Sequence, residues 1–397
     1  MEYRFSDKLA SLKPSAIREI FKSLSDPTVI SFAAGNPAAE SFPVGELARL
    51  SADIFEKTPV TALQYSLTEG YPPLREAVAA RLREKFAIGR AGDETFIVSG
   101  GNQGIELSAK VLCNEGDAVI CEEPSFIGAL NAFRSNGALP VGVPLHSDGI
   151  DPDELDAVLA REPRARMIYL IPTFQNPSGI TTSYEKRRKI YEIALRRGVM
   201  IFEDNPYGEL RFAGEDIPTF KSMDTEGIVI YCSSFSKILS AGMRVGYVTA
   251  PGPVVQKMVV AKQVEDVHTN IFFQMLCYRY MSECDLDAHI EDIRAIYRRK
   301  CGLMLGCLER ELPQSVEFTR PEGGLFVWCT LPEGYDMSVF VKKALEKKVA
   351  VVPGTAFLCD PEGSTRSFRL NYSTPSDDDI REGCARLGAA AREMGIR

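Results

Sequence analysis

The sequence has few residues of the kinds that bind structural metals or form disulfide frameworks. Only three histidines occur among 397 residues, and they lie too far apart for the spacing of a zinc site. None of the ten cysteines belongs to a CxxC pair, and several lie within apolar runs. We therefore expect no metal site, and reduced cysteines that are mostly buried in the core.

Long basic runs and long apolar runs are also missing. The net charge is −8 and no long basic run occurs, which argues against a nucleic-acid surface. No apolar run reaches membrane-spanning length, and the first residues lack the apolar core of a signal peptide. We expect a cytoplasmic protein that binds neither nucleic acid nor membrane.

Two common phosphate-binding motifs are absent, and the remaining pattern predicts an α/β fold. The sequence has neither GxGxxG nor GxxxxGK[ST], which disfavours dinucleotide and nucleoside-triphosphate sites. Short apolar runs alternate with amphipathic segments, as in a mostly parallel sheet covered by helices on both faces. The seven predicted strands are Thr95–Ser99, Ala118–Cys121, Leu139–Leu145, Met167–Ile171, Val199–Phe202, Ile228–Cys232 and Val245–Ala250.

The sequence predicts one helix with well-defined ends and one helix near the N-terminus. The helix over Ser183–Arg197 begins with a capping box from Thr182 to Glu185 and ends at Gly198. An N-terminal helix is predicted over Ser15–Leu24.

The character of the sequence changes after Pro253. Two long helices are predicted over Val254–Met281 and His289–Leu312, and a smaller α+β ending follows them. We place a boundary near residue 285. The predicted large domain spans 46–285, and the smaller domain is discontinuous, formed by 1–45 and 286–397.

The stretch SSFSKILSAGMR, which follows the sixth predicted strand, is the strongest candidate site. Ser234, Ser236 and Arg244 suit a phosphate, through hydroxyl hydrogen bonds and a bidentate charged fork. Lys237 can form a Schiff base with an aldehyde. Phosphate and aldehyde on one small molecule suggest pyridoxal 5′-phosphate (PLP). Taken alone, the stretch could equally be a surface loop with an ordinary lysine.

Three more polar loops follow predicted strands, at SGGNQG, NPSG and DNPY. Ligands of open α/β sheets bind outside the carboxyl ends of the strands. Asp204 could pair with a protonated pyridine nitrogen, while Asn176 and Tyr207 could bond the ring hydroxyl oxygen. Singly, Asp204 could be a helix cap and Tyr207 a packing residue. Their joint occurrence favours the PLP site.

With these motifs, the chain resembles the class I/II aminotransferase family of fold-type I PLP enzymes. Within that family it is most similar to the 2-aminoadipate/kynurenine and broad-specificity aminotransferases, including the aminotransferase-like part of MocR regulators. The motifs that carry the resemblance are SFAAGNP, LQYSLTEG, SGGNQG, EEPSF, PTFQNPSG, EDNPYGEL, SSFSKILSAGMRVGY and FRLNYS. The resemblance implies a PLP-binding large domain, a smaller α+β domain, and a homodimer with composite active sites.

The resemblance also implies a role for each site residue. Lys237 would hold the cofactor and then move the substrate proton, with Asp204 on the pyridine nitrogen. Phe126 would stack on the ring, and Arg369 would bind the substrate carboxylate. Asn176 and Tyr207 would contact the ring oxygen. The remaining expected contacts are Gly100, Gly101, Asn102, Ser234, Ser236 and Arg244 to the phosphate, Tyr65 to the phosphate of the partner subunit, and Gly35, Asn36 and Asn176 to the substrate.

Some positions depart from the family pattern. Gly101 stands where serine is common, so its phosphate contact would use the backbone alone. Asn36 replaces an apolar residue, and Ser66-Leu67 replaces a common Gly-Pro. The prediction of PLP as the cofactor does not depend on these departures. They affect which substrates the resemblance to the family implies.

Three functions remain open at this point. The leading one is an aminotransferase that moves an amino group between an L-amino acid and a 2-oxo acid, by a ping-pong mechanism through pyridoxamine phosphate. The second is a PLP-dependent lyase or decarboxylase on the same fold. The third is a ligand-sensing regulator, which would need a DNA-binding domain that we do not expect in the residues before SFAAGNP.

Overall fold

The structure of the protein is a computed structural model that describes residues 3–10 and 26–397. Its largest sheet has eight strands in the order β2-β9-β8-β7-β6-β3-β4-β5. These strands are β2 Asp93–Val98, β3 Ala118–Glu123, β4 Leu139–His146, β5 Gly149–Ile150, β6 Ala165–Leu170, β7 Met200–Asp204, β8 Val229–Ser234 and β9 Gly246–Pro251. All seven predicted strands are present, and the two-residue β5 extends the sheet.

The sheet is mostly parallel, as predicted. Strands β4, β3, β6, β7 and β8 pair in parallel, whereas β9 is antiparallel to both of its neighbours and β5 is antiparallel to β4. Because its central strands are buried on both faces, their side chains alternate between two apolar cores. Ile168 and Leu170 of β6 join one core, while Met167 and Tyr169 join the other.

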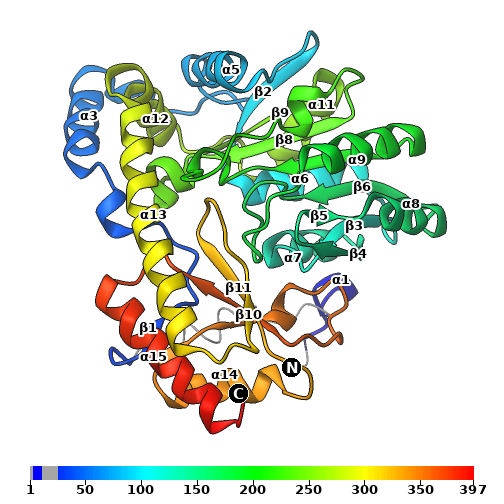
Figure 1. The fold of residues 1–397 in the computed structure, drawn as a ribbon. Helices are drawn as coiled ribbons and strands as arrows, with labels where there is room; N and C mark the ends of the chain where they lie inside the picture. Colours follow the sequence, from blue (N-terminus) through cyan, green and yellow to red (C-terminus); the bar gives the residue numbers. More distant parts are fainter. Residues whose placement is uncertain (1–2, 11–25) are drawn as a thin grey trace.

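Helices cover both faces of this sheet (Figure 1). One core includes residues of α8 Pro152–Arg161, α9 Tyr184–Arg197 and α10 Phe220–Met223. The opposite core includes residues of α5 Pro72–Phe86, α6 Gly101–Leu112, α7 Ile127–Ser135, α11 Gly252–Glu265 and α12 Ile271–Glu283. The layers therefore follow the predicted α/β arrangement.

Two of the predicted helices differ from the structure, and a third cannot be compared with it. Ser183, not Thr182, caps α9, because its side chain accepts a hydrogen bond from the Lys186 amide; Gly198 ends the helix in a left-handed conformation as predicted. The single helix predicted over Val254–Met281 is wrong, because the chain leaves the helix between α11 and α12. The helix predicted over Ser15–Leu24 lies outside the described residues.

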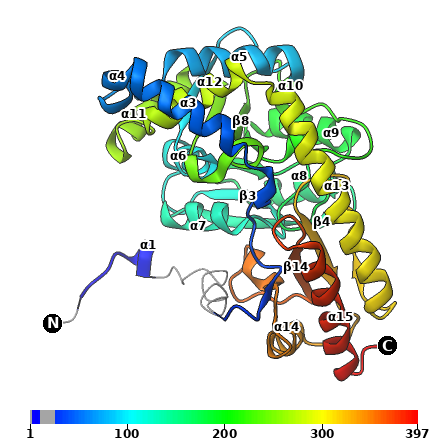
Figure 2. The same ribbon diagram turned by 90° about the vertical axis from the view of Figure 1, so that its left-hand side faces the viewer.

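A second group of elements lies below the large sheet in Figure 1 and Figure 2. A four-stranded antiparallel sheet has the order β10-β11-β14-β13, and β1 pairs in parallel with β12. The bounds are β1 Ile30–Ser31, β10 Glu317–Phe318, β11 Phe326–Thr330, β12 Val349–Ala350, β13 Val352–Pro353 and β14 Ser367–Asn371. The helices are α13 Leu286–Glu311, α14 Met337–Glu346 and α15 Asp377–Glu393.

The pairing of β1 with β12 brings an N-terminal segment next to the C-terminal part of the chain. Helix α13 runs down the left side of the molecule in Figure 1, from α12 beside the large sheet to α15 in the lower group. The helices before the large sheet include α1 Asp7–Ala10, α3 Val44–Lys57 and α4 Pro59–Leu63. The division into 46–285 and 1–45 with 286–397 stays a prediction.

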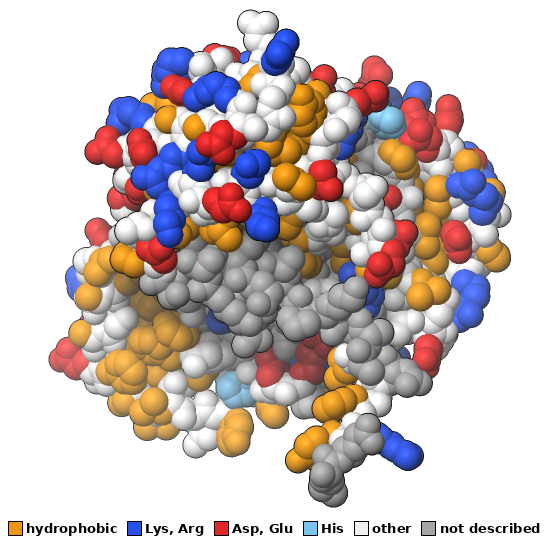
Figure 3. Space-filling view, turned by 90° about the horizontal axis from the view of Figure 1, so that it is seen from below, with side chains coloured by type: hydrophobic (Ala, Val, Ile, Leu, Met, Phe, Trp, Pro, Cys, Tyr) orange, Lys and Arg blue, Asp and Glu red, His pale blue; other side chains and the backbone are white. Residues whose placement is uncertain are grey.

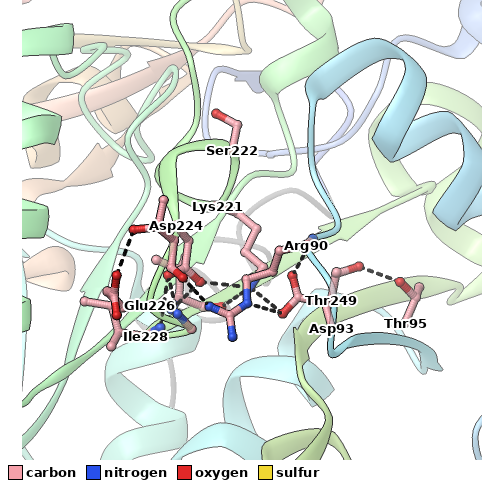
Figure 4. Close-up of polar contacts among 12 residues, drawn as sticks. Arg90, Asp93, Thr95, Lys221, Ser222, Asp224, Glu226, Ile228 and Thr249 are labelled. Atoms are coloured by element: carbon pink, nitrogen blue, oxygen red, sulfur yellow. Dashed lines mark hydrogen bonds and ion pairs between the residues drawn. The ribbon is translucent and has the colours of Figure 1, made fainter.

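A buried ion-pair cluster joins β2 to the loop before β8 (Figure 4). The Lys221 ammonium lies 2.9 Å from Asp93 Oδ1 and 3.0 Å from Asp224 Oδ2, and all three side chains are almost fully buried. Asp224 also accepts hydrogen bonds from the backbone amides of 227, 228 and 229. The charges are thus paired and the loop is fixed to the sheet edge.

All ten cysteines are free thiols, and eight of them are buried, which agrees with the sequence. Within the part of the chain that the structure describes, no helix combines the length and apolar character needed to cross a bilayer.

Candidate active site

A cavity of about 340 Å³ lies at the carboxyl ends of the central strands, against β11 and β14 of the smaller sheet. It collects most of the predicted site residues from segments far apart in the sequence. The predicted residues that line it are Gly35, Asn36, Gly101, Asn102, Phe126, Asn176, Asp204, Tyr207, Ser234, Ser236, Lys237, Arg244 and Arg369.

Lys237 lies in a five-residue π-helix, Ser236–Ser240, directly after β8. Its ammonium donates a 2.6 Å hydrogen bond to the carbonyl oxygen of Gly35. Burial lowers the pKa of Lys237 to about 8, and the nearby guanidinium groups of Arg369 and Arg244 act in the same direction. The uncharged fraction of this amine near neutral pH is therefore much larger than that of an ordinary lysine, and the uncharged form is the nucleophile.

Asp204 ends β7 and is buried beneath the cavity. Its Oδ2 accepts a 2.7 Å hydrogen bond from the Tyr169 hydroxyl. Burial raises the pKa of Asp204 to about 7, although the bond from Tyr169 acts in the opposite direction. This carboxylate is suited to hold a proton on a basic nitrogen placed in the cavity.

Arg369 reaches the cavity from β14 of the smaller sheet and contacts the loop after β6 of the large sheet. Its Nη1 donates to Asn176 Oδ1 and its Nη2 to the carbonyl oxygen of Ala33, both at 2.8 Å. The guanidinium lies over the rings of Phe326 and Phe357, at 4.2 and 5.0 Å. Among the described residues, its buried Nε has no hydrogen-bond partner. Burial lowers the pKa of Arg369 only to about 10, so it stays cationic and suits a carboxylate.

Tyr207 is buried next to Asn176 and Arg369. Burial raises the pKa of the Tyr207 hydroxyl above its usual range, while Arg369 and Asn176 partly offset this effect. The hydroxyl therefore stays protonated and can donate a hydrogen bond to an oxygen in the cavity.

The opposite end of the cavity is suited to an anion. Helix α6 begins at Gly101 and directs its first backbone amides to this end. The hydroxyls of Ser234 and Ser236 are hydrogen bonded to each other at 2.7 Å, and Arg244 lies beside them. Arg244 Nη2 donates to the Ser99 carbonyl at 3.2 Å, which fixes its guanidinium near the helix start.

Gly100 contributes to this end without lining the cavity. It has φ +83°, and a Cβ atom there would lie 2.1 Å from Arg244 Nη2. The position therefore needs glycine, both for its backbone conformation and for the close approach of the arginine. Gly100 thus supports the site rather than forming its surface.

Tyr65 is the predicted residue that the structure keeps away from the cavity of its own chain. Its side chain is 80% exposed and packs edge-on against His268, with ring centroids 5.8 Å apart. Neither Tyr65 nor His268 lines the cavity. This position is compatible with a site completed by a partner.

The sequence did not indicate three residues that hold the site together. Tyr169 binds Asp204, as described above. Gln175 donates to the Pro124 carbonyl at 2.7 Å and accepts from the Ser178 amide at 2.9 Å, so it joins the loops of Phe126 and Asn176. Glu122 is buried and accepts from the Ile171 amide at 3.0 Å. Tyr169 and Glu122 lie in strands, where a single sequence gives no signal of function, whereas Gln175 lies in the PTFQNPSG loop after β6.

The cavity residues fit PLP. Serines, an arginine and helix amides form an anion site at one end, and an amine with a lowered pKa lies between it and Arg369. Asp204 Oδ1 lies near the start of α6, since a Cβ on Gly101 would lie 4.0 Å from it, and both residues line the cavity. The donor set therefore matches a phosphate, an aldehyde and a ring nitrogen on one molecule.

Residues 27–387 match the family described as Aminotransferase class I and II. The chain is 39% identical over 396 residues to Aromatic-amino-acid aminotransferase 1 of Thermococcus litoralis, covering 99% of this chain and 95% of that protein. It is 40% identical over 393 residues to 2-aminoadipate transaminase of Thermus thermophilus, covering 98% and 97%.

The chain is also similar to a solved aminotransferase structure. The fold has a TM-score of 0.91 to the crystal structure of an α-aminoadipate aminotransferase from Thermus thermophilus, complexed with N-(5′-phosphopyridoxyl)-L-leucine. That pair shares 40% identity and covers 98% of this chain and 97% of the other. The chain belongs to the class I and II aminotransferase family.

The fold, the enzyme class and the cofactor predicted from the sequence are thereby confirmed. The protein is a PLP-dependent aminotransferase of fold type I, with an amino acid and a 2-oxo acid as substrates. The comparisons do not favour the lyase, decarboxylase or regulator alternatives.

Proposed function

We propose that the residues of this cavity divide the work of transamination among themselves, with Lys237 as the group that holds PLP and moves the substrate proton. The observation that supports this most directly is the position of Lys237, whose amine shares one cavity with Asp204 and Arg369. When bound, PLP supplies a ring that accepts electron density from the substrate carbon as it loses its proton.

The chain's own residues supply binding and proton transfer. Asp204 holds a proton on the ring nitrogen, and Asn176 and Tyr207 bind the ring oxygen. Phe126 covers one face of the ring. The phosphate is held by Gly101 and Asn102 at the start of α6 and by Ser234, Ser236 and Arg244, with Gly100 supporting them.

Substrate binding is assigned to the side of the cavity formed by the smaller sheet. Arg369 binds the carboxylate of the amino acid and of the 2-oxo acid in turn, because one site serves both halves of a ping-pong reaction. Gly35 and Asn36 lie at the same side and contact the substrate. Lys237 accepts the proton from the substrate Cα once its amine is free and uncharged, which its lowered pKa favours.

We also assign a homodimer with composite sites and a cytoplasmic location. Exposed apolar side chains lie on α4, on the segment after it and at the end of α11: Val60, Leu63, Tyr65 and Val264 are 75%, 73%, 80% and 87% exposed. Hydrophobic side chains also gather at the lower left of the face shown in Figure 3. A patch of this kind is typical of a surface that a partner covers. Tyr65 is one of the four exposed side chains named above. It is therefore suited to reach the phosphate site of the partner subunit.

The half-reaction tests the proposed function. The PLP-loaded enzyme is mixed with single amino acids, beginning with aromatic amino acids and 2-aminoadipate, and its absorbance is followed. We expect the cofactor spectrum to change to that of pyridoxamine phosphate with release of one 2-oxo acid, and a second 2-oxo acid to restore it. Release of carbon dioxide or ammonia without formation of pyridoxamine phosphate would contradict it.

A further inference from the structure

The two oxygens of the Asp204 carboxylate have different surroundings. Oδ2 accepts the hydrogen bond from Tyr169, with 2.7 Å between the oxygens. Oδ1 lies on the side of Gly101, whose backbone lines the cavity. Among the described residues, Tyr169 is the one hydrogen-bond donor to this side chain. One oxygen is thus engaged within the protein and the other is left for a ligand.

Tyr169 is held in a single position by its packing. It lies on β6, opposite Phe202 of the neighbouring β7, and its side chain is fully buried. The rings of Phe133 and Phe202 lie 5.4 and 5.8 Å from its ring. Burial raises the pKa of the Tyr169 hydroxyl well above its usual range, so the hydroxyl remains a donor at all physiological pH values.

Lys237 and Arg369 line the same cavity as Asp204 and are mostly cationic near neutral pH, whereas the titratable groups on the strands around the pair of Tyr169 and Asp204 are mostly uncharged. Cys121 and Glu122 face it from β3, Cys232 faces it from β8, and Tyr207 follows β7. Burial raises the pKa of Glu122 to about 8 and raises the pKa of both thiols above their usual range. Asp204 forms no ion pair within the described part of the chain, so the hydrogen bond from Tyr169 is the direct contact that favours its charged form.

We propose that Tyr169 is a positioning residue that favours the ionised form of Asp204 and turns its Oδ1 to the ring nitrogen of the cofactor. This inference rests on the role assigned to Asp204 above. Without the hydroxyl, the buried carboxylate loses its only donor among the described residues, and its protonated form becomes more stable. A protonated Asp204 pairs poorly with a pyridinium, so the ring nitrogen would lose its proton more readily.

The protonation state of the ring nitrogen tests this directly. The wild-type protein and Tyr169→Phe are loaded with PLP labelled with ¹⁵N in the ring, and the ¹⁵N chemical shift is measured as a function of pH. We expect a protonated nitrogen at pH 7 in the wild type. In Tyr169→Phe we expect a shift toward the neutral pyridine value, with the midpoint lower by about one pH unit. Equal titration curves would overturn the proposal.

A matched variant controls for the loss of a buried hydroxyl. Tyr231 is buried on β8, and its hydroxyl accepts from Asn205 Nδ2 at 3.2 Å without contacting Asp204. Tyr231→Phe should therefore leave the ¹⁵N shift at the wild-type value. A shift in Tyr231→Phe as large as that in Tyr169→Phe would overturn the proposal, because the effect would then be general to the sheet.

A double-mutant cycle separates positioning from a structural role. The affinity of the cofactor-free protein for PLP is measured for the wild type, Tyr169→Phe, Asp204→Asn and the double variant. When Asp204 is present, Tyr169→Phe should weaken PLP binding about tenfold, which is the effect of losing one hydrogen bond to a charged group. In the Asp204→Asn background, the same substitution should have little effect on PLP binding. Equal losses in both backgrounds would overturn the proposal.

Two further measurements cover the cases in which Tyr169→Phe does not fold or the role assigned to Asp204 is wrong. If Tyr169→Phe does not fold, 3-fluorotyrosine at position 169 keeps the shape of the side chain and makes its hydroxyl a stronger donor. The ring nitrogen should then keep its proton to higher pH, and an unchanged curve would count against Tyr169. If Asp204→Asn itself leaves the ¹⁵N shift unchanged, the role of Asp204 is wrong; if only Tyr169→Phe does so, this inference alone is wrong.

Discussion

The guanidinium of Arg369 is hydrogen bonded to the side-chain oxygen of Asn176 at 2.8 Å, and this contact joins β14 of the small sheet to the loop after β6 of the large sheet. One residue is assigned to the substrate and the other to the cofactor, so the same contact sets their relative position. The second terminal nitrogen of Arg369 holds the Ala33 carbonyl. The planar fork is therefore used on two fixed partners, and a lysine cannot replace both bonds.

Arg369→Lys should impair both halves of the reaction. The charge is kept but the fork is lost, so we expect kcat/KM to fall about 10- to 100-fold for the amino acid and for the 2-oxo acid. Steady-state kinetics with each substrate varied would measure this. Arg366→Lys is the matched control, since Arg366 donates to the Leu331 carbonyl and does not line the cavity. Unchanged constants for both substrates would assign the carboxylate to another group.

The capture of PLP by the cofactor-free protein should depend on pH with a midpoint near 8. The pKa of Lys237 is lowered to about 8 from its ordinary value of 10.5, and only the uncharged amine attacks an aldehyde. The rate should therefore rise as pH increases through 8 and level off above it. Stopped-flow absorbance would follow the reaction, with a free lysine blocked at its α-amine as the reference. A rate that continues to rise toward pH 10 would contradict the lowered pKa.

Most of the sheet could be predicted because its strands are short apolar runs, and runs buried on both faces leave a clear pattern. The two-residue β5 and the break between α11 and α12 carried no such signal. In that break Val267 adopts a left-handed φ of +65°, which no glycine or proline marks in the sequence. Thr182 and Ser183 are both good caps, and only the structure shows that Ser183 accepts the hydrogen bond.

The site could be predicted where residues follow strands in loops of distinctive composition. Lys237, Asp204 and Asn176 were found in this way, and the structure brings them to one cavity. Tyr169 could not be found, because it lies within a strand whose sequence is typical of a core, and Glu122 could not be found, because nothing in the pair Glu122-Glu123 marks one of the two as buried. Their importance depends on the strand order, in which β6 lies between β3 and β7, and a single sequence does not contain this order.

Mixed dimers should be more active than either parent variant, although each variant alone loses activity to a different extent. Lys237→Ala removes the lysine, and Tyr65→Ala removes the residue assigned to the partner's phosphate. A mixed dimer has one site with both lesions and one site with neither. Refolding the two variants together should recover about half of the wild-type activity per mixed dimer, from the count of sites in a symmetric pair.

Differently tagged chains would allow the mixed dimers to be purified and assayed against each variant refolded alone. No gain in purified mixed dimers would mean that Tyr65 serves its own subunit or none.

The buried cluster in Figure 4 should matter for stability. Lys221→Met leaves Asp93 and Asp224 buried without their cation, so the free energy of unfolding should fall by about 3–5 kcal/mol. Chemical denaturation of the cofactor-free protein would measure it. The control is Lys348→Met, which removes a partly exposed pair with Asp26 at 2.9 Å and should change stability by less than about 1 kcal/mol. If the two substitutions lowered the free energy of unfolding equally, burial would not explain the contribution of the Lys221 cluster to stability.

The most direct test of the account concerns the attachment of the cofactor. The PLP-loaded protein is reduced with borohydride, digested, and its peptides are mapped by mass spectrometry. Among the described residues, Lys237 is the lysine that lines the cavity, between the phosphate site and Arg369. The account predicts the pyridoxyl group on Lys237. A pyridoxyl group on any other lysine, or none on Lys237 in a protein that transaminates, would contradict it.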